Sequence, residues 1–300
     1  MKRPFRPAWI LLACFFFMAF APSAWAQVRD TGLWWLPEVM TKGGEKIDRL
    51  FYFIFWLTFA VFLLTQSIYI WFIIKYRRKR GVPAVYSHGN NTLELVWTTL
   101  PAIVFIVLGV YSNRLWNREL RAPAPADSIR IDIVAYQFVW HIRNPGRDGK
   151  LGEFSQQLLS KDNWFGLKEG DADGNDDFQS EGVLTIPVGK TVNVILRSLD
   201  VIHSFYVPQF RMYQDAVPGR EIDWVWFEAT KTGNIELACS QLCGTGHYNM
   251  KAKINIVSVE EYDKLVAEKS KAALMQKLQK NAASLPPPPT DATPASLAAK

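Results

Sequence analysis

Cysteine and histidine are scarce in this chain of 300 residues, which contains three of the first and four of the second. Three cysteines exclude a disulfide-dense secreted scaffold, and no C-x-x-C-H motif for covalent haem attachment is present. With so few histidines, any metal site must draw on a short list of residues. The formal net charge is +6. A basic total is often associated with nucleic-acid binding, so the positions of the charges matter.

The N-terminus has the three parts of a secretory signal. A basic start precedes an apolar stretch at 9–20 and the small-x-small pattern Ala-Trp-Ala at 24–26. The apolar stretch is too short to span a bilayer comfortably. We predict a signal peptide at 1–26, with an uncleaved anchor as the alternative, and an external segment at 27–47.

Two apolar runs without charged residues follow, at 50–74 and 95–111. Each is long enough to cross the hydrocarbon core of a membrane. Between them, residues 75–80 (KYRRKR) carry five positive charges, and no acidic residue occurs from 75 to 93. The positive-inside rule places this loop in the cytoplasm and both ends of the hairpin outside. We therefore predict a transmembrane hairpin at 48–116, with spans at about 50–74 and 93–113 and a cytoplasmic loop at 75–92.

Residues 127–258 have the pattern of a β-rich domain. Strand-like alternation of β-branched residues occurs at 129–142, 182–198 and 251–257, while 144–181 is a polar excursion rich in Gly, Asp and Asn. No helical period separates the strands, which favours a sandwich or barrel. A capping box at Ser258 predicts a helix at 259–282, and the Pro/Ala-rich sequence at 283–300 predicts a disordered tail.

Four candidate metal ligands lie within CSQLCGTGHYNM, at 239–250. Cys239, Cys243, His247 and Met250 have the spacing C-x3-C-x3-H-x2-M. Thiolate, imidazole and thioether together favour copper, whereas zinc sites use Cys and His without Met. A Cys239–Cys243 disulfide is the other alternative, and it would leave His247 and Met250 without a role.

A second histidine must come from elsewhere, because a mononuclear blue-copper site uses two. His203 lies shortly after a strand-like segment, where a cupredoxin-type barrel presents its distant histidine. His88 falls in the predicted cytoplasmic loop, and His141 lies within a strand, where a lone histidine is more often structural. Two bridging thiolates with one histidine for each metal would hold two copper ions.

From about residue 40 to 258, the chain resembles cytochrome c oxidase subunit II. The hairpin, the His203 segment and the ligand loop occur in the family's order, and DAVPG at 215–219 is similar to the family's stretch after the distant histidine. The resemblance implies a membrane-anchored fold, in which a two-helix transmembrane hairpin precedes an all-β cupredoxin-like barrel with a dinuclear CuA centre.

In that family both cysteines bridge two copper ions, each histidine caps one copper, and a methionine and a backbone carbonyl are weak ligands. The resemblance therefore implies a copper site formed by Cys239 and Cys243 as bridges, His203 and His247 as caps, Met250, and the backbone carbonyl of Gln241.

Two departures from the family concern partners of the copper site. Gln241 stands where the family usually has a Glu whose side chain reaches a magnesium ion shared with subunit I. Neutral Gln is a poorer ligand for a hard cation, so the magnesium site is not carried over. Phe138 stands where the family commonly has the Trp that receives electrons from cytochrome c. Phe138 and nearby Trp140 are the candidate aromatics for electron input, and Tyr213, in place of a frequent Lys, also indicates a divergent branch.

Glu94, three residues before Trp97, matches a carboxylate of the family near the mouth of a proton pathway on the cytoplasmic side. The alternative is an interfacial residue at a helix start, where the helix dipole favours an acidic side chain.

The resemblance implies the electron-input subunit of a haem–copper terminal oxidase in a bacterial inner membrane. Cytochrome c would donate electrons, and haem in subunit I would use them to reduce oxygen to water, coupled to proton translocation. Subunit I, other oxidase subunits, cytochrome c and lipid are the implied partners, and an external domain excludes nucleic acid. The alternatives are a quinol oxidase subunit, which lacks the copper ligands, and a membrane-anchored copper-delivery protein. Nitrous oxide reductase shares the copper loop but lacks the hairpin.

The positions of the charges explain the basic total. Removal of 1–26 takes away three positive charges and no acidic residue, and the predicted cytoplasmic loop holds five more. The domain at 127–258 has 13 Lys or Arg and 17 Asp or Glu, a net charge of −4. The external domain is therefore acidic, which suits a positively charged electron donor such as cytochrome c.

Overall fold

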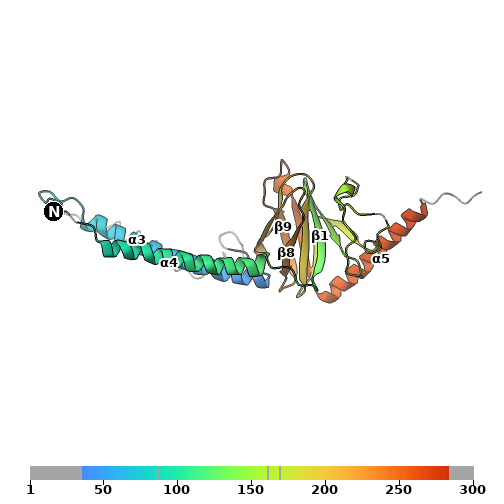
Figure 1. Ribbon diagram of the computed structural model, residues 1–300, viewed down its shortest axis with the longest axis horizontal. Helices are drawn as coiled ribbons and strands as arrows, with labels where there is room; N and C mark the ends of the chain where they lie inside the picture. Colours follow the sequence, from blue (N-terminus) through green and yellow to red (C-terminus); the bar gives the residue numbers. More distant parts are fainter. Residues whose placement is uncertain (1–35, 85, 87, 161, 169, 284–300) are drawn as a thin grey trace, which may run out of the picture.

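A long helical hairpin projects from a β-sandwich in the computed structural model (Figure 1), which describes residues 36–84, 86, 88–160, 162–168 and 170–283. The predicted signal peptide, the first part of the external segment (27–35) and residues 284–300 of the predicted tail lie outside the described residues.

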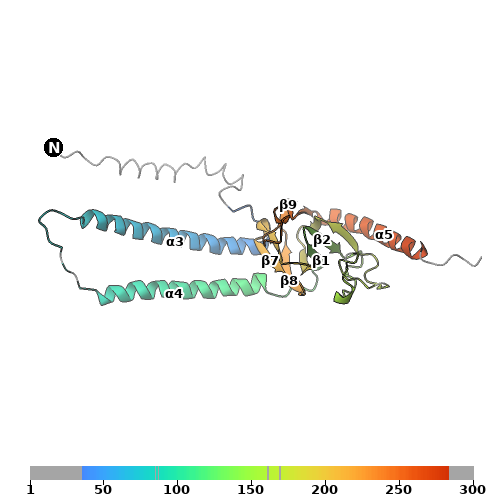
Figure 2. The same ribbon diagram turned by 90° about the horizontal axis from the view of Figure 1, so that it is seen from above.

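The hairpin consists of α3 (Lys42–Lys75) and α4 (Asn91–Leu115), and a π-helical turn, η1 (Trp116–Leu120), continues α4. Side-chain oxygens of Thr41 and Asn90 accept hydrogen bonds from backbone N–H groups in the first turn of each helix, which caps both. Both helices are long and apolar enough to cross a membrane. No part of the described chain buries their most apolar segments. Figure 2 shows α3 and α4 joined at the end of the hairpin that is remote from the sandwich.

The start of α3 lies well before its apolar run. A helix of 34 residues is about 51 Å long, against a hydrocarbon core of about 30 Å. Its first two turns (42–49) carry charged side chains and stand at the sandwich end. There Lys46 pairs with Glu119 of η1 at 2.6 Å, and Lys42 pairs with Glu228 of the sandwich at 2.5 Å.

The sandwich is built from two five-stranded sheets, with strand orders β3-β2-β1-β5-β8 and β4-β10-β9-β6-β7. Most neighbouring strands are antiparallel, but β1 pairs with β5 and β4 pairs with β10 in parallel. The strands are β1 (Ile129–Tyr136), β2 (Val139–Asn144), β3 (Phe178–Glu181), β4 (Val183–Pro187), β5 (Thr191–Ser198), β6 (His203–Val207), β7 (Met212–Ala216), β8 (Ile222–Glu228), β9 (Gly233–Cys239) and β10 (Lys251–Val257).

The alternating segment at 129–142 folds as a hairpin of β1 and β2, with Tyr136 paired to Val139 across the turn. The inner side chains of both sheets form one continuous apolar core, centred on residues such as Ile133, Trp140 and Leu196, which are fully buried. The middle of β1 is buried on both faces. Its outer face is covered because the polar excursion at 144–181 folds back over this sheet.

Buried ion pairs hold the polar excursion to the outer face of the sheet. Arg143 donates to Asp132 at 2.8 Å and to Asp177 of the excursion at 2.9 Å, and Arg197 also donates to Asp132. Asp177 accepts a further hydrogen bond from the backbone N–H of Gly152 at 3.0 Å. A buried charge without a partner would strongly destabilise the folded state, so these pairings are needed to keep the excursion in place.

The last element is α5 (Val259–Ala283), which begins after Ser258. The backbone N–H of Glu261 donates to the Ser258 hydroxyl at 3.2 Å, which caps the first turn. Tyr262 and Val266 pack against Phe178 of β3 in a second, small apolar cluster, so that the first half of the helix is anchored to the sandwich.

Asp177 gives the fold a measurable pH dependence. Burial raises its pKa from 3.8 to about 6, even though the Gly152 N–H and Arg143 favour its charged form. Because the pKa is higher in the folded state than in the unfolded state, protonation of Asp177 stabilises the fold. This contribution to the free energy of unfolding is complete below pH 3.8 and is lost as the pH rises through about 6. Relative to Asp177→Asn, the wild-type chain should therefore lose about 1–2 kcal/mol of unfolding free energy between acid and neutral pH.

The measurement is tryptophan fluorescence during denaturant unfolding of the full chain in detergent, across this pH range. Asp173→Asn, at a half-exposed side chain, is the control and should show a constant difference from wild type. A constant difference for Asp177→Asn as well would contradict the prediction.

Candidate metal centre

The pairing of β6 with β9 brings distant parts of the sequence together. Phe205 of β6 is the partner of Cys239 at the end of β9. His203 lies two residues before Phe205, and strand residues two apart share a face. The side chain of His203 is therefore on the same side as that of Cys239, and it is fully buried.

The ligand loop connects β9 to β10 as the end of an antiparallel pair. Lys251 of β10 is the partner of Ala238, and the backbone N–H of Cys239 donates to the carbonyl of Met250 at 3.0 Å. The first and last candidate ligands of the loop are thus adjacent at its base. Within the loop, the 3-10 turn η4 (His247–Asn249) turns His247 back toward the cysteines.

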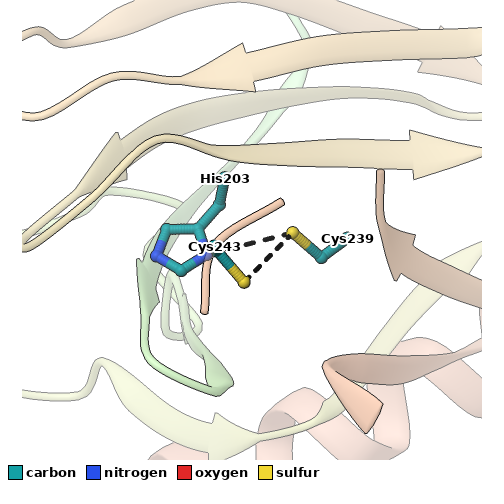
Figure 3. Close-up of side chains that lie close together, drawn as sticks. All are labelled: His203, Cys239 and Cys243. Carbon is teal, nitrogen blue, oxygen red and sulfur yellow. Dashed lines mark hydrogen bonds between the residues drawn. The ribbon is translucent and has the colours of Figure 1, made fainter. Parts of the chain in front are cut away.

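Three buried side chains form the centre of the site (Figure 3). The Cys239 and Cys243 sulfur atoms are 3.8 Å apart, and His203 Nδ1 is 3.9 Å from the Cys239 sulfur. Their potential ligand atoms all lie within 4.8 Å of one another, a spacing that could hold a metal ion. Both cysteines are free, so the structure does not contain the disulfide considered as an alternative.

The other three candidate ligands surround the two sulfur atoms. His247 Nδ1 is 3.5 Å and Met250 Sδ is 3.8 Å from the Cys243 sulfur, and the Gln241 carbonyl oxygen is 3.2 Å from the Cys239 sulfur. The structure thus brings together the five side chains that the sequence pattern singled out and the Gln241 carbonyl that the family resemblance implied. Thiolate, imidazole and thioether form a donor set that suits copper.

Asp200 was missed by the sequence reasoning. Its carboxylate contacts His203 Nε2 at 2.8 Å and accepts from the backbone N–H groups of Gln137 at 2.8 Å and Val201 at 2.7 Å. Burial opposes its charged form, but these hydrogen bonds, led by the one from His203, lower its pKa overall. An Nε2–H bonded to Asp200 leaves the Nδ1 lone pair of His203 facing the sulfur atoms, as a metal ligand requires. The only hint of this contact in the sequence is the acidic side chain three positions before His203.

The β1–β2 turn covers the ligand loop. Gln137 donates from its side-chain amide to the carbonyl of Cys243. Phe138 is 36% exposed and lies directly against Gly244 and Gly246. Gly244 has a φ of +135°, which only glycine adopts readily, so both the backbone geometry and the close approach of Phe138 require small residues here.

The remaining sequence candidates lie at different distances from the centre. Trp140 is fully buried, and its ring centroid is 6.3 Å from that of His203. His141 stacks on Trp164 at 4.3 Å on the outer face of the sheet, and burial lowers its pKa.

Glu94 is in the first turn of α4. Figure 2 shows that this helix starts at the end of the hairpin remote from the sandwich. His88 lies in the loop that joins the two helices.

The environment of the thiols disfavours the charged form of at least one. Burial, and then the Cys239 sulfur beside it, raise the pKa of the Cys243 thiol to about 12. Because a metal binds thiolates, metal binding here must release protons.

A β-sandwich with a buried Cys/His/Met cluster at one end and two membrane-length helices before it defines a membrane-anchored, cupredoxin-like protein. Two family models match the chain: "Cytochrome C oxidase subunit II, transmembrane domain" over residues 32–115, and "Cytochrome C oxidase subunit II, periplasmic domain" over residues 133–257. The chain belongs to the cytochrome c oxidase subunit II family. The predicted fold class and the resemblance are therefore confirmed.

Curated relatives agree with this assignment. The chain is 34% identical over 233 residues to alternative cytochrome c oxidase subunit 2 of Bradyrhizobium diazoefficiens, covering 76% of this chain and 82% of that protein. It is 34% identical over 230 residues to probable cytochrome c oxidase subunit 2 of Rickettsia bellii, covering 76% and 81%. Among solved structures, the periplasmic domain of subunit II of the Bradyrhizobium japonicum oxidase aligns with 25% identity and a TM-score of 0.38, covering 50% of this chain and 98% of that domain.

The contact between Phe138 and the loop glycines yields a prediction. A Cβ at Gly246 would lie 2.5 Å from Phe138 Cδ2 and 2.6 Å from Cγ, so Gly246→Ala must displace either the ring or the loop. Because groups that position ligands affect metal affinity by 10- to 100-fold, we expect copper affinity to fall about tenfold. Competition between the copper-loaded full chain and a chelator measures this.

Gly109→Ala is the matched control, since its Cβ would meet no atom within 4 Å. Equal copper affinity in the Gly246→Ala and Gly109→Ala chains would show that the contact does not shape the site.

Proposed function

We propose that this chain is the electron-input subunit of a haem–copper terminal oxidase. It accepts electrons from cytochrome c at a dinuclear copper centre and delivers them to haem in subunit I, where oxygen is reduced to water with proton translocation. The convergence of two free thiols, two imidazoles, a thioether and a backbone carbonyl carries the proposal.

The arrangement of donors supports two copper ions rather than one. Each cysteine has its own histidine neighbour: His203 lies beside Cys239 and His247 beside Cys243. Each cysteine also has its own weak donor, since the Gln241 carbonyl lies beside Cys239 and Met250 beside Cys243. Cys239 and Cys243, with one imidazole and one weak donor beside each, would hold the two copper ions, which would supply one-electron transfer.

The protein residues around the site hold this donor set in place and exclude water. Asp200 fixes the ring of His203, and Gln137 ties the carbonyl of Cys243 to the β1–β2 turn. Phe138 is partly exposed above the loop and is our candidate for the contact through which electrons arrive, with buried Trp140 beside His203. We assign no magnesium ligand, because the side chain at 241 is neutral Gln.

The membrane arrangement follows from the same proposal. The sandwich lies on the periplasmic side of a bacterial inner membrane, and the basic residues of the α3–α4 loop remain in the cytoplasm. Glu94 then lies near the cytoplasmic face, as expected of a residue at the mouth of a proton pathway. Subunit I and lipid cover the exposed apolar faces of α3 and α4.

Substitution of one bridging cysteine tests the dicopper assignment. The copper-loaded full chain should give an electron paramagnetic resonance spectrum with hyperfine coupling to two copper nuclei, and Cys243→Ser should abolish it. Ser240→Ala is the control, since its side chain is exposed in the same loop, and it should keep the spectrum. A wild-type signal from one copper nucleus, or an unchanged spectrum in Cys243→Ser, would contradict the proposal.

The acidic charge of the domain at 127–258 predicts salt-dependent oxidation of cytochrome c. Charge steering raises association rates at low ionic strength and is screened over about 10 Å at 0.1 M salt. The second-order rate of the full oxidase should fall about tenfold between low and physiological salt. An uncharged reductant provides the control, and a salt-independent rate with cytochrome c would argue against an electrostatically steered donor.

A further inference from the structure

Arg211 has an unusual backbone conformation. Among the described residues other than glycine, it alone has a positive φ, with φ 55° and ψ 33°. This left-handed region favours glycine, because a Cβ there approaches the residue's own backbone. A larger residue persists in such a conformation only where the surrounding structure holds it. The contacts of the Arg211 side chain identify what holds it.

The guanidinium group of Arg211 binds the membrane helix α3. Nε donates to Asp48 Oδ1 at 2.7 Å and Nη2 to Asp48 Oδ2 at 2.9 Å, which makes a bidentate ion pair. Nη2 also donates to the carbonyl of Pro37 at 2.6 Å, and Nη1 donates to the carbonyl of Pro208. The two charged side chains are only 10% and 15% exposed, so salt screens the pair less than it would at the surface. The fork of an arginine suits this geometry, whereas the point charge of a lysine does not.

The chain around Asp48 is docked on the same turn. The backbone N–H of Met40 donates to the carbonyl of Gln209 at 2.8 Å, and the Thr41 hydroxyl donates to the carbonyl of Phe210 at 3.2 Å. Gly44 in the first turn of α3 fits this crowded junction, because a Cβ there would lie 2.5 Å from Val39 Cγ2, 2.8 Å from Thr41 Oγ1 and 3.3 Å from Arg211 Cγ. The start of α3 therefore rests on the short helix η3 (Pro208–Phe210) and on Arg211.

This turn connects directly to a candidate metal ligand. Strand β6 enters η3, and β7 leaves it after Arg211, with Val207 paired to Met212 at the turn and His203 paired to Ala216 at the other end. The hairpin is five residues long, or about 16 Å. Figure 2 shows the N-terminal end of α3 meeting the sandwich beside β7. One end of this hairpin thus contacts the membrane helix, and the other end carries His203.

We propose that the Arg211–Asp48 ion pair is a positioning clamp, which fixes the β6–β7 hairpin, and the metal centre at its far end, relative to the membrane helices. Arg211 is a positioning residue that acts through the hairpin. The effect of the clamp on electron transfer rests on the proposed function, in which the clamp sets the distance between the copper centre and the haem of the partner subunit. Electron transfer rates fall steeply with that distance.

Arg211→Gly separates the clamp from ordinary stability. Glycine relieves the left-handed backbone and removes the guanidinium, so the sandwich need not lose stability while the clamp is lost. In the full oxidase, we expect unchanged copper content and copper spectrum but an electron transfer rate from copper to haem that is about tenfold lower, since small displacements of reacting centres have large effects on rate. Asp48→Asn should act in the same direction, and the double variant should be no slower than the slower single variant. Lys150→Ala, which removes an exposed ion pair with Asp173 in the polar excursion, is the control and should keep the wild-type rate.

A second readout needs neither copper nor the other subunits. Hydrogen exchange of the full chain in nanodiscs should become faster at 37–48 and 208–216 in Arg211→Gly and Asp48→Asn, while the ligand-loop region at 233–257 keeps its protection. Unchanged exchange in both segments, or a wild-type transfer rate in Arg211→Gly with its copper spectrum intact, would overturn the clamp. If the wild-type oxidase lacks a two-copper spectrum, the proposed function fails, and the exchange experiment still decides whether the clamp exists.

Discussion

The antiparallel pairing of β6 with β9 is the constraint on which the rest of the site depends. It sets Phe205 opposite Cys239 and so places His203 beside the first cysteine, 36 positions away in sequence. The loop from Cys239 to Met250 closes on itself through the β9–β10 pair. Local loop closure and one long-range strand pairing together therefore bring the candidate metal ligands to one place in the sandwich.

Two sets of contacts hold this site in place. The β1–β2 turn supplies the backbone N–H that binds Asp200, the Gln137 amide that binds the loop, and the Phe138 ring that packs on its glycines. From the membrane side, the ion pair of Arg211 with Asp48 ties the β6–β7 hairpin to α3. Such fixed surroundings suit the proposed electron-transfer role, because small ligand movements lower the reorganisation needed at each transfer.

The sequence was informative wherever a short-range pattern determines the structure. Charge-free runs revealed the two membrane helices, and the C-x3-C-x3-H-x2-M spacing identified four groups that the loop does bring together. It was less informative where contacts are long-range. The alternation at 129–142 did not reveal that β1 is buried on both faces, because the covering excursion is held by ion pairs between Arg143, Asp132 and Asp177. Asp200 and Arg211 look like ordinary surface charges in the sequence, and only the folded chain shows their partners.

The central claim is that the two cysteine sulfur atoms jointly hold a pair of copper ions. X-ray absorption at the copper edge, measured on the copper-loaded full chain, tests it most directly because it reports the neighbours of each copper. Each ion should have thiolate sulfur and imidazole nitrogen as neighbours, together with a second copper close by. A single copper environment without a copper neighbour, or one made of nitrogen and oxygen alone, would contradict it.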